Sequence, residues 1–210
     1  LKSRNTWQAR WEAHMAAPQA VLPPLQFFSP HESHGPESMN TPPGLQHNPA
    51  QRQRGGRRLG LETLHSFLDA RALSYRGGIS SPLSSPTACS RISAYLAYGC
   101  ISLREVVQST RAALDALPPQ ASRHKAGLIG FISRLYWHCH FIQKLEGEPE
   151  IEWRNMHRGY DGLREDGWND AHFAALTSAR TGWPMVDACV VMLHQTGWLN
   201  FRMRAMLVSV

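Results

Sequence analysis

The stretch from residue 86 to residue 107 gathers side chains that bind anions. Cys89, Ser90 and Ser93 surround Arg91, directly before a helical pattern of apolar residues. Free backbone amides, hydroxyl groups and a guanidinium at the start of a helix together make an anion site. Capped helix starts with a surface arginine are also common in soluble proteins. The stretch by itself therefore predicts either an anion site or an ordinary helix start.

Two short helices are expected to position these side chains. Ser90 is the expected N-cap of the first helix, and Gly99 closes it. Ser102 and Glu105 have the spacing of a capping box for the second helix. The two helices are therefore expected to meet at the glycine.

A long amphipathic helix is expected from about residue 123 to residue 145. Its apolar residues recur at helical spacing and predict a face buried in the core. Arg134, Trp137, His138 and Phe141 fall to one side of that face. An edge of aromatic and cationic side chains beside a core face can line a pocket, so this helix is a second candidate for a functional site.

The cysteines and histidines do not predict a metal site. The four cysteines lack CxxC spacing and lie among apolar neighbours, which is typical of reduced, mostly buried thiols in a cytosolic protein. His138 to His140 are consecutive on a helix, where neighbouring side chains point about 100° apart. Three such neighbours do not converge on one ion, and we expect no metal.

Composition divides the chain into an irregular part and a folded part. Residues 1–58 hold 8 of the 14 prolines, and such a segment cannot bury enough apolar surface to offset its ordering entropy. We expect a Pro-rich, largely irregular linker over 1–58 that stays outside the core, and a folded domain over 59–210. At 42% hydrophobic residues, the chain can form one sizeable core.

The charge favours a polyanionic partner without showing one. The formal net charge is +6 and the isoelectric point is about 9.5, but the basic residues are spread along the chain. No apolar run reaches membrane-spanning length and no signal peptide opens the sequence. We therefore expect a cytoplasmic protein that does not bind a membrane.

Two blocks of sequence resemble the photolyase/cryptochrome flavoprotein family. Residues 90–102, SRISAYLAYGCIS, are similar to the phosphate-binding signature of that family, and residues 181–188 and 196–204, TGWPMVDA and TGWLNFRMR, resemble its TGYPxVDA and GWxxNRxR blocks in the same order. The resemblance covers roughly residues 60–210. It implies an all-α fold, the N-terminal part of the FAD-binding helical domain truncated at its C-terminus, with residues 1–58 as an interdomain linker.

The resemblance implies FAD as the cofactor. Its diphosphate would lie at the signature, and its ring would lie beside the long helix. The cofactor-binding positions carried over are Tyr75, Cys89, Ser90, Arg91, Ile92, Ser93, Phe131, Arg134, His138 and Arg204. From the residues alone, Tyr75 is equally well interpreted as an aromatic side chain at the end of a helix, packed on the core.

The resemblance also implies light-driven electron transfer from reduced FAD to a UV-damaged pyrimidine lesion flipped out of DNA. The DNA-binding positions carried over are Arg134, Trp137, Phe201 and Arg202. Two catalytic candidates are His138, as a proton donor, and Trp168, as the nearest match to the surface end of the family's row of electron-carrying tryptophans. A surface tryptophan and a solvated arginine are the simpler interpretations of Trp168 and Arg202.

Four positions depart from the family pattern. Arg134 stands where the family has a glutamate that contacts the lesion, and an arginine has no acceptor with which to replace it. His138 stands in place of an arginine, and Phe201 and Ala205 replace an asparagine and a methionine. A cryptochrome-type photoreceptor without repair, a non-enzymatic helical DNA-binding module and a flavin-free scaffold therefore remain open.

The sequence begins without methionine and stops within an apolar helical pattern. We expect a monomeric fragment, inactive alone, that lacks an N-terminal antenna domain and the C-terminal half of the FAD domain.

Overall fold

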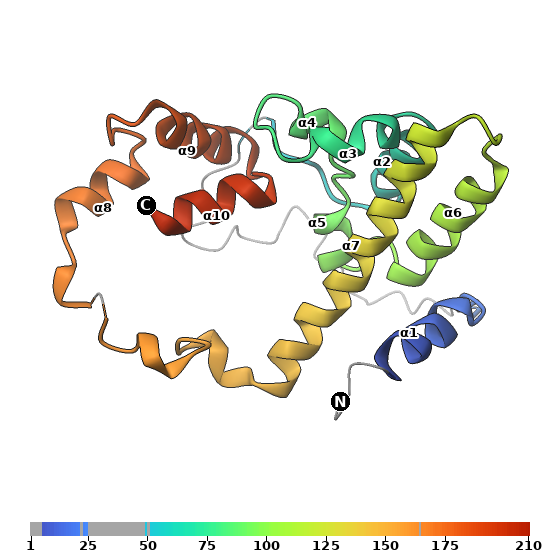
Figure 1. Cartoon of the computed structure of the whole chain (residues 1–210), viewed down its shortest axis with the longest axis horizontal. Coiled ribbons are helices and arrows are strands. Elements are labelled where there is room, and N and C mark those ends of the chain that lie inside the picture. Colours follow the sequence, from blue (N-terminus) through green and yellow to red (C-terminus); the bar gives the residue numbers. More distant parts are fainter. Residues whose placement is uncertain (1–5, 22, 25–48, 50, 164) are drawn as a thin grey trace, which may run out of the picture.

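The computed structural model describes residues 6–21, 23–24, 49, 51–163 and 165–210 (Figure 1). Within these ranges the chain forms helices and no strand, which confirms the all-α prediction. No helix in this part of the chain is long and apolar enough to span a membrane.

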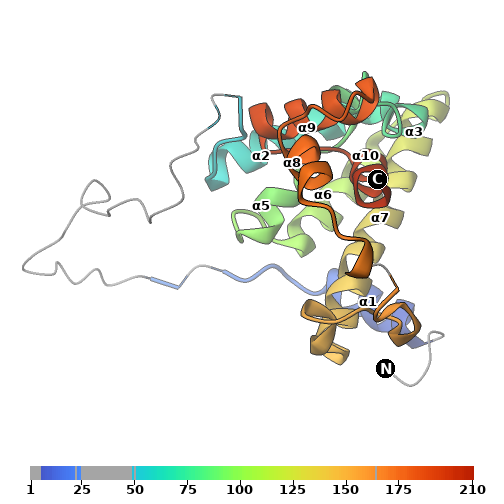
Figure 2. The same ribbon diagram turned by 90° about the vertical axis from the view of Figure 1, so that its left-hand side faces the viewer.

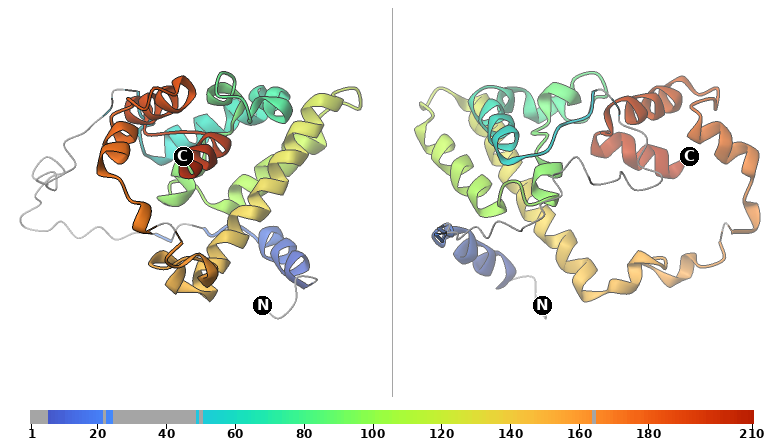
Figure 3. Two further views of the ribbon diagram at one scale, coloured as in Figure 1. Left: turned by 60° about the vertical axis from the view of Figure 1, so that its left-hand side comes forward. Right: turned by 180° about the vertical axis from the view of Figure 1, so that it is seen from behind.

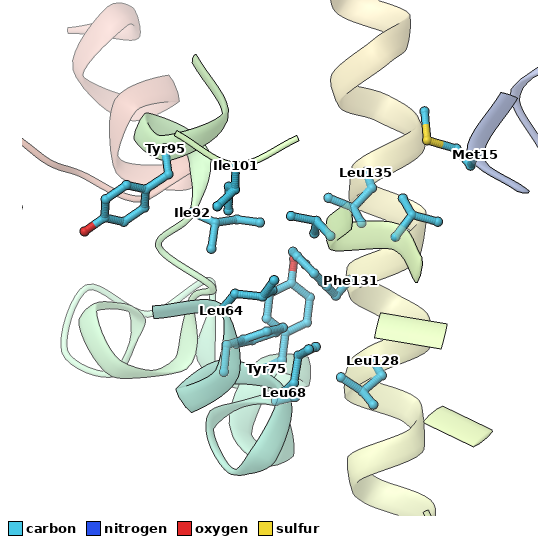
Figure 4. Close-up of a cluster of buried hydrophobic side chains, with 14 of the residues drawn as sticks. Met15, Leu64, Leu68, Tyr75, Ile92, Tyr95, Ile101, Leu128, Phe131 and Leu135 are labelled. Carbon is cyan, nitrogen blue, oxygen red and sulfur yellow. The ribbon is translucent and has the colours of Figure 1, made fainter. Parts of the chain in front are cut away.

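A long helix and the elements packed against it form the core. The elements are α2 (Arg57–Asp69), η3 (Arg71–Ser74), α3 (Tyr75–Gly78), α6 (Leu103–Ala116) and α7 (Ser122–Gly147). Their buried side chains meet along one face of α7, as Figure 4 shows. The largest side chains with almost no exposed surface include Leu64, Phe67, Ile92, Ile101, Val106 and Leu128. The predicted long helix is therefore confirmed. Its apolar stripe is buried at Leu128, Phe131 and Leu135, but the prediction is wrong further along, where Ile142 is 48% exposed.

The elements α7 and η3 approach each other closely at Gly127. A Cβ atom built on Gly127 would lie 1.9 Å from the carbonyl oxygen of Ala72. Only a residue without a side chain allows α7 and η3 to pack at this distance. Gly127 thus sets the position of η3, which carries Arg71 and leads into Tyr75.

The segment expected to be irregular contains a helix that belongs to the core. Residues Trp7–Ala16 form α1, which packs against α6 (Figure 3), and Trp11 and Met15 are only 5% and 4% exposed. The expectation that residues 1–58 stay outside the core is therefore wrong for this helix. Trp11 and Met15 are four residues apart, which places their side chains on one face of the helix. Most of the remaining linker lies outside the described residues.

Side chains of α6 hold the C-terminal end of α1. Gln108 donates to the carbonyl oxygens of Met15 and Ala17 at 2.8 and 2.9 Å. Arg104 donates to those of His14 and Pro18 at 3.0 and 2.8 Å. The last carbonyls of a helix have no partner within it, so these contacts supply the missing donors. The partners lie about ninety positions away in sequence, so α1 is fixed by tertiary contacts.

The chain after α7 runs through an exposed segment before it returns to the fold. This segment contains η4 (Pro149–Glu152), η5 (Arg158–Tyr160) and η6 (Glu165–Gly167), and none of the three has a buried residue. It leads to α8 (Asp170–Thr177), α9 (Pro184–Thr196) and α10 (Phe201–Ser209). The helices α9 and α10 lie side by side (Figures 1 and 2).

Capping residues place these last helices. Asn200 accepts a hydrogen bond from the N–H of Met203 at 3.1 Å and so is the N-cap of α10. The Nδ2 of the same side chain donates to the carbonyl oxygen of Ile79 at 3.0 Å and so ties α10 to the chain after α3. Asp187 accepts hydrogen bonds from Thr181 and Gly182, which holds the turn before α9.

Candidate functional site

The anion-site stretch forms a turn between α4 (Ser85–Ala88) and α5 (Ser93–Ala97). Arg91 has a φ of 64°, an uncommon value for a residue with a side chain. The prediction that Ser90 caps the following helix is wrong, because α5 begins two residues later and Ile92 occupies the N-cap position. The side chain of Ile92 is 2% exposed and anchors the turn in the core.

The second expected helix begins as predicted, with one difference. The N–H of Glu105 donates to Ser102 Oγ at 3.1 Å, which confirms the cap of α6. The carboxylate of Glu105 does not close the capping box. It pairs with the guanidinium of Arg57 at 2.7 Å, and this pair lowers the pKa of Glu105.

The side chain of Arg91 is held in place from two sides. Its guanidinium carbon lies 3.9 Å from the centre of the Trp198 ring, a close cation–π contact. Its Nε donates to Gln53 Oε1 at 3.1 Å, and Gln53 Nε2 donates back to the Arg91 carbonyl at 2.9 Å. Sequence reasoning missed Gln53, since nothing in the local pattern links it to a turn thirty-eight residues later.

Several arginines gather around the thiol of Cys89. Burial raises the pKa of this thiol, and the positive charges of Arg91, Arg71 and Arg204 oppose the increase. The structure thus brings together residues from η3, the turn and α10. In the described part of the chain, no carboxylate forms an ion pair with any of these three arginines. Positive charge without a carboxylate partner on this side of the fold favours an anionic ligand.

Arg71 is a further member of the cluster that the sequence analysis did not identify. Its guanidinium donates to the carbonyl oxygens of Cys89 and Ser90, the second at 3.1 Å. The acceptors are backbone atoms, which any residue type supplies. No sequence motif therefore marks the contact, and only the folded chain reveals it.

Tyr75 links the turn to the long helix. It is 7% exposed, and burial raises its pKa to about 12, with Cys89 adding to the increase. The positive charge of Arg134 opposes this shift. Phe131 is 2% exposed, and its ring centre lies 5.9 Å from that of Tyr75 (Figure 4). It supports Tyr75 from the core side.

The expected aromatic and cationic edge is present on α7. Arg134 is exposed, Trp137 is 39% exposed and His138 is half-buried. Burial lowers the pKa of His138, and its Nδ1 has no hydrogen-bond partner among the described residues. A neutral imidazole with a buried, unsatisfied nitrogen is suited to hydrogen-bond a ligand.

The DNA-binding candidates on α10 lie at the surface. Phe201 is 71% exposed, and Arg202 is exposed with its Nε donating to Ser80 Oγ at 3.2 Å. Trp168 is 63% exposed and donates its indole N–H to Asp170 at 2.8 Å. Its ring packs against Phe173 at 5.0 Å, so its described contacts are with its own sequence neighbours. The structure does not bring Trp168 to the arginine cluster.

Two surface hollows beside α1 are lined by residues of α1, α6 and α7, and neither is lined by a residue expected to bind the cofactor. The described residues also contain no group of three or more histidine, cysteine, aspartate or glutamate side chains able to hold a metal ion.

Residues 131–210 match the family model described as the FAD binding domain of DNA photolyase. The match covers the edge of α7 and the whole of α8, α9 and α10. This part of the chain belongs to the FAD-binding domain of the photolyase/cryptochrome family, as a partial domain. Its signature turn at Arg91 precedes the matched region.

Curated photolyases support the assignment over most of the chain. The deoxyribodipyrimidine photo-lyase of Streptomyces griseus is 29% identical over 207 residues, which are 95% of this chain and 40% of that protein. The (6-4)DNA photolyase of Arabidopsis thaliana is 27% identical over 111 residues, 52% of this chain and 19% of that protein. The matched part of the chain thus spans about two fifths of the length of the first relative and about one fifth of the length of the second.

Solved structures of the family have the same fold. A class III photolyase from Agrobacterium tumefaciens has a TM-score of 0.63 at 27% identity, covering 73% of this chain and 30% of that one. An archaeal photolyase from Sulfolobus tokodaii, whose structure holds two FAD molecules, has a TM-score of 0.54 at 30% identity, covering 74% and 31%. A Synechocystis cryptochrome, at 22% identity and a TM-score of 0.61, shares the fold.

The residues present fit the flavin cofactor of this family. Arg91 and Arg204 supply positive charge that no carboxylate in the described chain neutralises. His138 Nδ1, on the edge of α7, is buried and has no hydrogen-bond partner among the described residues. Diphosphate and a ring with hydrogen-bonding edges are chemically matched to these groups.

Proposed function

We propose that this chain forms one wall of the FAD site of a photolyase-like flavoprotein, which repairs UV-damaged pyrimidine lesions in DNA by light-driven electron transfer. The arginine cluster at the Arg91 turn carries the proposal, because it lies in a chain whose family domain binds FAD. Bound FAD supplies the photochemistry, and the protein supplies position, charge and exclusion of water.

The turn is assigned to the diphosphate. The amides and hydroxyls of Ser90 and Ser93 and the guanidinium of Arg91 would bind the phosphate oxygens. Cys89 and Ile92 shape the turn around them. Arg204 adds charge from α10.

The edge of α7 is assigned to the flavin ring. Tyr75 and Arg134 lie at one end of it, supported by Phe131, and His138 would hydrogen-bond the ring through Nδ1. Because burial lowers the pKa of His138, its imidazole is largely neutral at pH 7. One ring nitrogen then donates a hydrogen bond and the other accepts one.

DNA is the proposed partner. Trp137 and Phe201 present exposed aromatic surface for stacking on a flipped base, and Arg134 and Arg202 present exposed cations for phosphates. The net charge of +6 adds a non-specific attraction to DNA. We place the protein in the cytoplasm as a monomer, with an antenna domain and the remaining FAD domain completing it. Trp168 remains the candidate for electron entry at the surface.

A photoreceptor without repair is the second candidate. Arg134 stands where a repair enzyme of the family carries a lesion-binding carboxylate, and its positive charge acts on the pKa of Tyr75. Because a guanidinium is only a donor, it cannot accept the hydrogen bonds of a lesion base.

The test is the visible absorption spectrum of the natural protein that contains this chain, purified in the dark. We expect a flavin band that bleaches under blue light in the presence of a thiol reductant. An assay with dimer-containing and (6-4)-containing oligonucleotides then separates repair from a photoreceptor. The 210 residues alone are expected to show no repair. A folded, colourless natural protein would overturn the proposal and favour a flavin-free scaffold or a DNA-binding module.

A further inference from the structure

All five N–H groups of the Arg71 guanidinium have acceptors. Nε donates to Ser66 Oγ at 3.2 Å, and Nη2 donates to the carbonyl oxygens of Thr63 and Ser90 at 2.8 and 3.1 Å. Nη1 donates to the carbonyl oxygens of Cys89 and, at 3.4 Å, Thr87. The side chain therefore joins α2 to the chain between α4 and the Arg91 turn, using every donor that an arginine has.

These bonds fix the orientation of two peptide planes. In a trans peptide the N–H of one residue points opposite to the C=O of the residue before it. With the carbonyls of Cys89 and Ser90 directed at Arg71, the N–H groups of Ser90 and Arg91 point away from it. Among the described residues, neither N–H has a hydrogen-bond partner. The clamp thus presents two free amides side by side, which is the arrangement of a backbone anion site.

Arg71 is itself held by the core. It follows α2 at the start of η3, and η3 packs on α7 where Gly127 meets Ala72. Its guanidinium carbon lies 5.5 Å from the centre of the buried Phe67 ring. Burial lowers the pKa of Arg71, yet arginine remains charged in proteins. No carboxylate pairs with it in the described chain, so neutral acceptors, four backbone carbonyls and the hydroxyl of Ser66, surround its charge.

We propose that Arg71 is a positioning residue for the FAD diphosphate. It holds the turn so that the amides of Ser90 and Arg91 face the phosphates and Arg91 keeps its left-handed conformation, while its own donors are all used by the protein. The proposal rests on the proposed function, because it assigns the diphosphate to this turn.

The experiment compares three variants of the natural protein that contains this chain, stripped of FAD and titrated with it. Arg71→Met removes the donors at similar length, and Arg71→Lys keeps the charge with three donors instead of five. Arg58→Met is the matched control, because Arg58 lies on the neighbouring α2 with a side chain 78% exposed. The measurements are the FAD dissociation constant, the helical circular dichroism and the ³¹P resonances of bound FAD.

We expect Arg71→Met to raise the FAD dissociation constant about tenfold or more, as for other hydrogen bonds to charged groups, with a helical spectrum like that of the wild type. The ³¹P resonances of bound FAD should shift in Arg71→Met. The dissociation constant of Arg71→Lys should lie between those of Arg71→Met and the wild type, and Arg58→Met should match the wild type in both measurements. A merely structural role would lower the unfolding temperature without moving the ³¹P resonances of the protein that stays folded.

An unchanged dissociation constant and unchanged ³¹P resonances in Arg71→Met would overturn the proposal. Should that variant not fold, the same result in Arg71→Lys would overturn it. Failure of the wild-type protein to bind FAD would overturn the proposed function, which distinguishes the two conclusions.

Discussion

The two sides of the candidate site are held in different ways. At the turn, Arg71 and Gln53 bind main-chain carbonyls and Arg91 lies on Trp198, so the backbone has one defined path. On α7 the site consists of side chains on a helix face, and His138 Nδ1 has no partner in the described chain. The comparison indicates that the turn is built before a ligand arrives, whereas the helix face acquires its hydrogen bonds from the ligand.

The scaffold under the turn should be the most sensitive part. Gly127→Ala places a Cβ 1.9 Å from the Ala72 carbonyl, a backbone atom that cannot rotate away. We expect a loss of about 3 kcal/mol in the free energy of unfolding, measured by urea denaturation of the natural protein. Gly147→Ala is the control, because a Cβ there meets nothing within 4 Å. Equal stability of both variants would show that α7 and η3 pack less tightly than described.

Removing the charge of the turn should affect the ligand more than the fold. Arg91→Ala should weaken FAD binding by about 10- to 100-fold, the value of a lost charge-assisted hydrogen bond of about 1.5–3 kcal/mol. The helical circular dichroism should change little, because the core below Ile92 is untouched. Flavin occupancy after dialysis provides the measurement. Unchanged occupancy would contradict the assignment of Arg91 to the diphosphate.

The position of α10 should depend on its cap. Asn200→Ala removes both the cap at Met203 and the bond to the Ile79 carbonyl, and Asn200 is 2% exposed. We expect a loss of about 2 kcal/mol in the free energy of unfolding.

Asn169→Ala is the matched control for that variant. Asn169 caps α8 by accepting from the N–H of His172 at 3.0 Å, but it lies on the exposed segment. Its loss should cost about 0.5–1 kcal/mol, within the range for a solvated cap. A larger effect at Asn169 than at Asn200 would mean that the exposed segment, and not the tie to Ile79, limits stability.

Tyr75, which lies between the turn and α7, should make a small, pH-dependent contribution to the free energy of unfolding. Its folded pKa is raised to about 12, whereas an unfolded tyrosine titrates near 10. Ionisation therefore stabilises the unfolded chain first, and stability should fall by about 1 kcal/mol between pH 9 and pH 11. Tyr75→Phe should lack this part of the decrease in melting temperature. Identical pH profiles would place Tyr75 in a more solvated environment.

Local sequence signals identified the helices well. Period and caps predicted α6 and α7, and the cap Ser102 is present as expected. These features depend on residues within one or two helical turns, which a single sequence displays directly. The same signals placed Ser90 at a helix start, where the structure instead has a left-handed turn at Arg91.

Long-range contacts were not visible in the sequence. The pattern of residues 1–58 predicted an irregular linker, yet α1 is fixed by Arg104 and Gln108 from a helix far along the chain. Composition measures the average burial of a segment and does not register two well-placed side chains, Trp11 and Met15.

The sequence by itself determined the all-α class, the helices that carry the candidate residues and the family resemblance, because these lie in local periodicity and in contiguous motifs. Only the tertiary structure decided which side chains share a site. It joined Tyr75 to Phe131, Arg91 to Trp198 and Arg71 to the carbonyls of the turn. Such contacts join atoms that are distant in the chain and often belong to the backbone, so residue identity alone does not encode them.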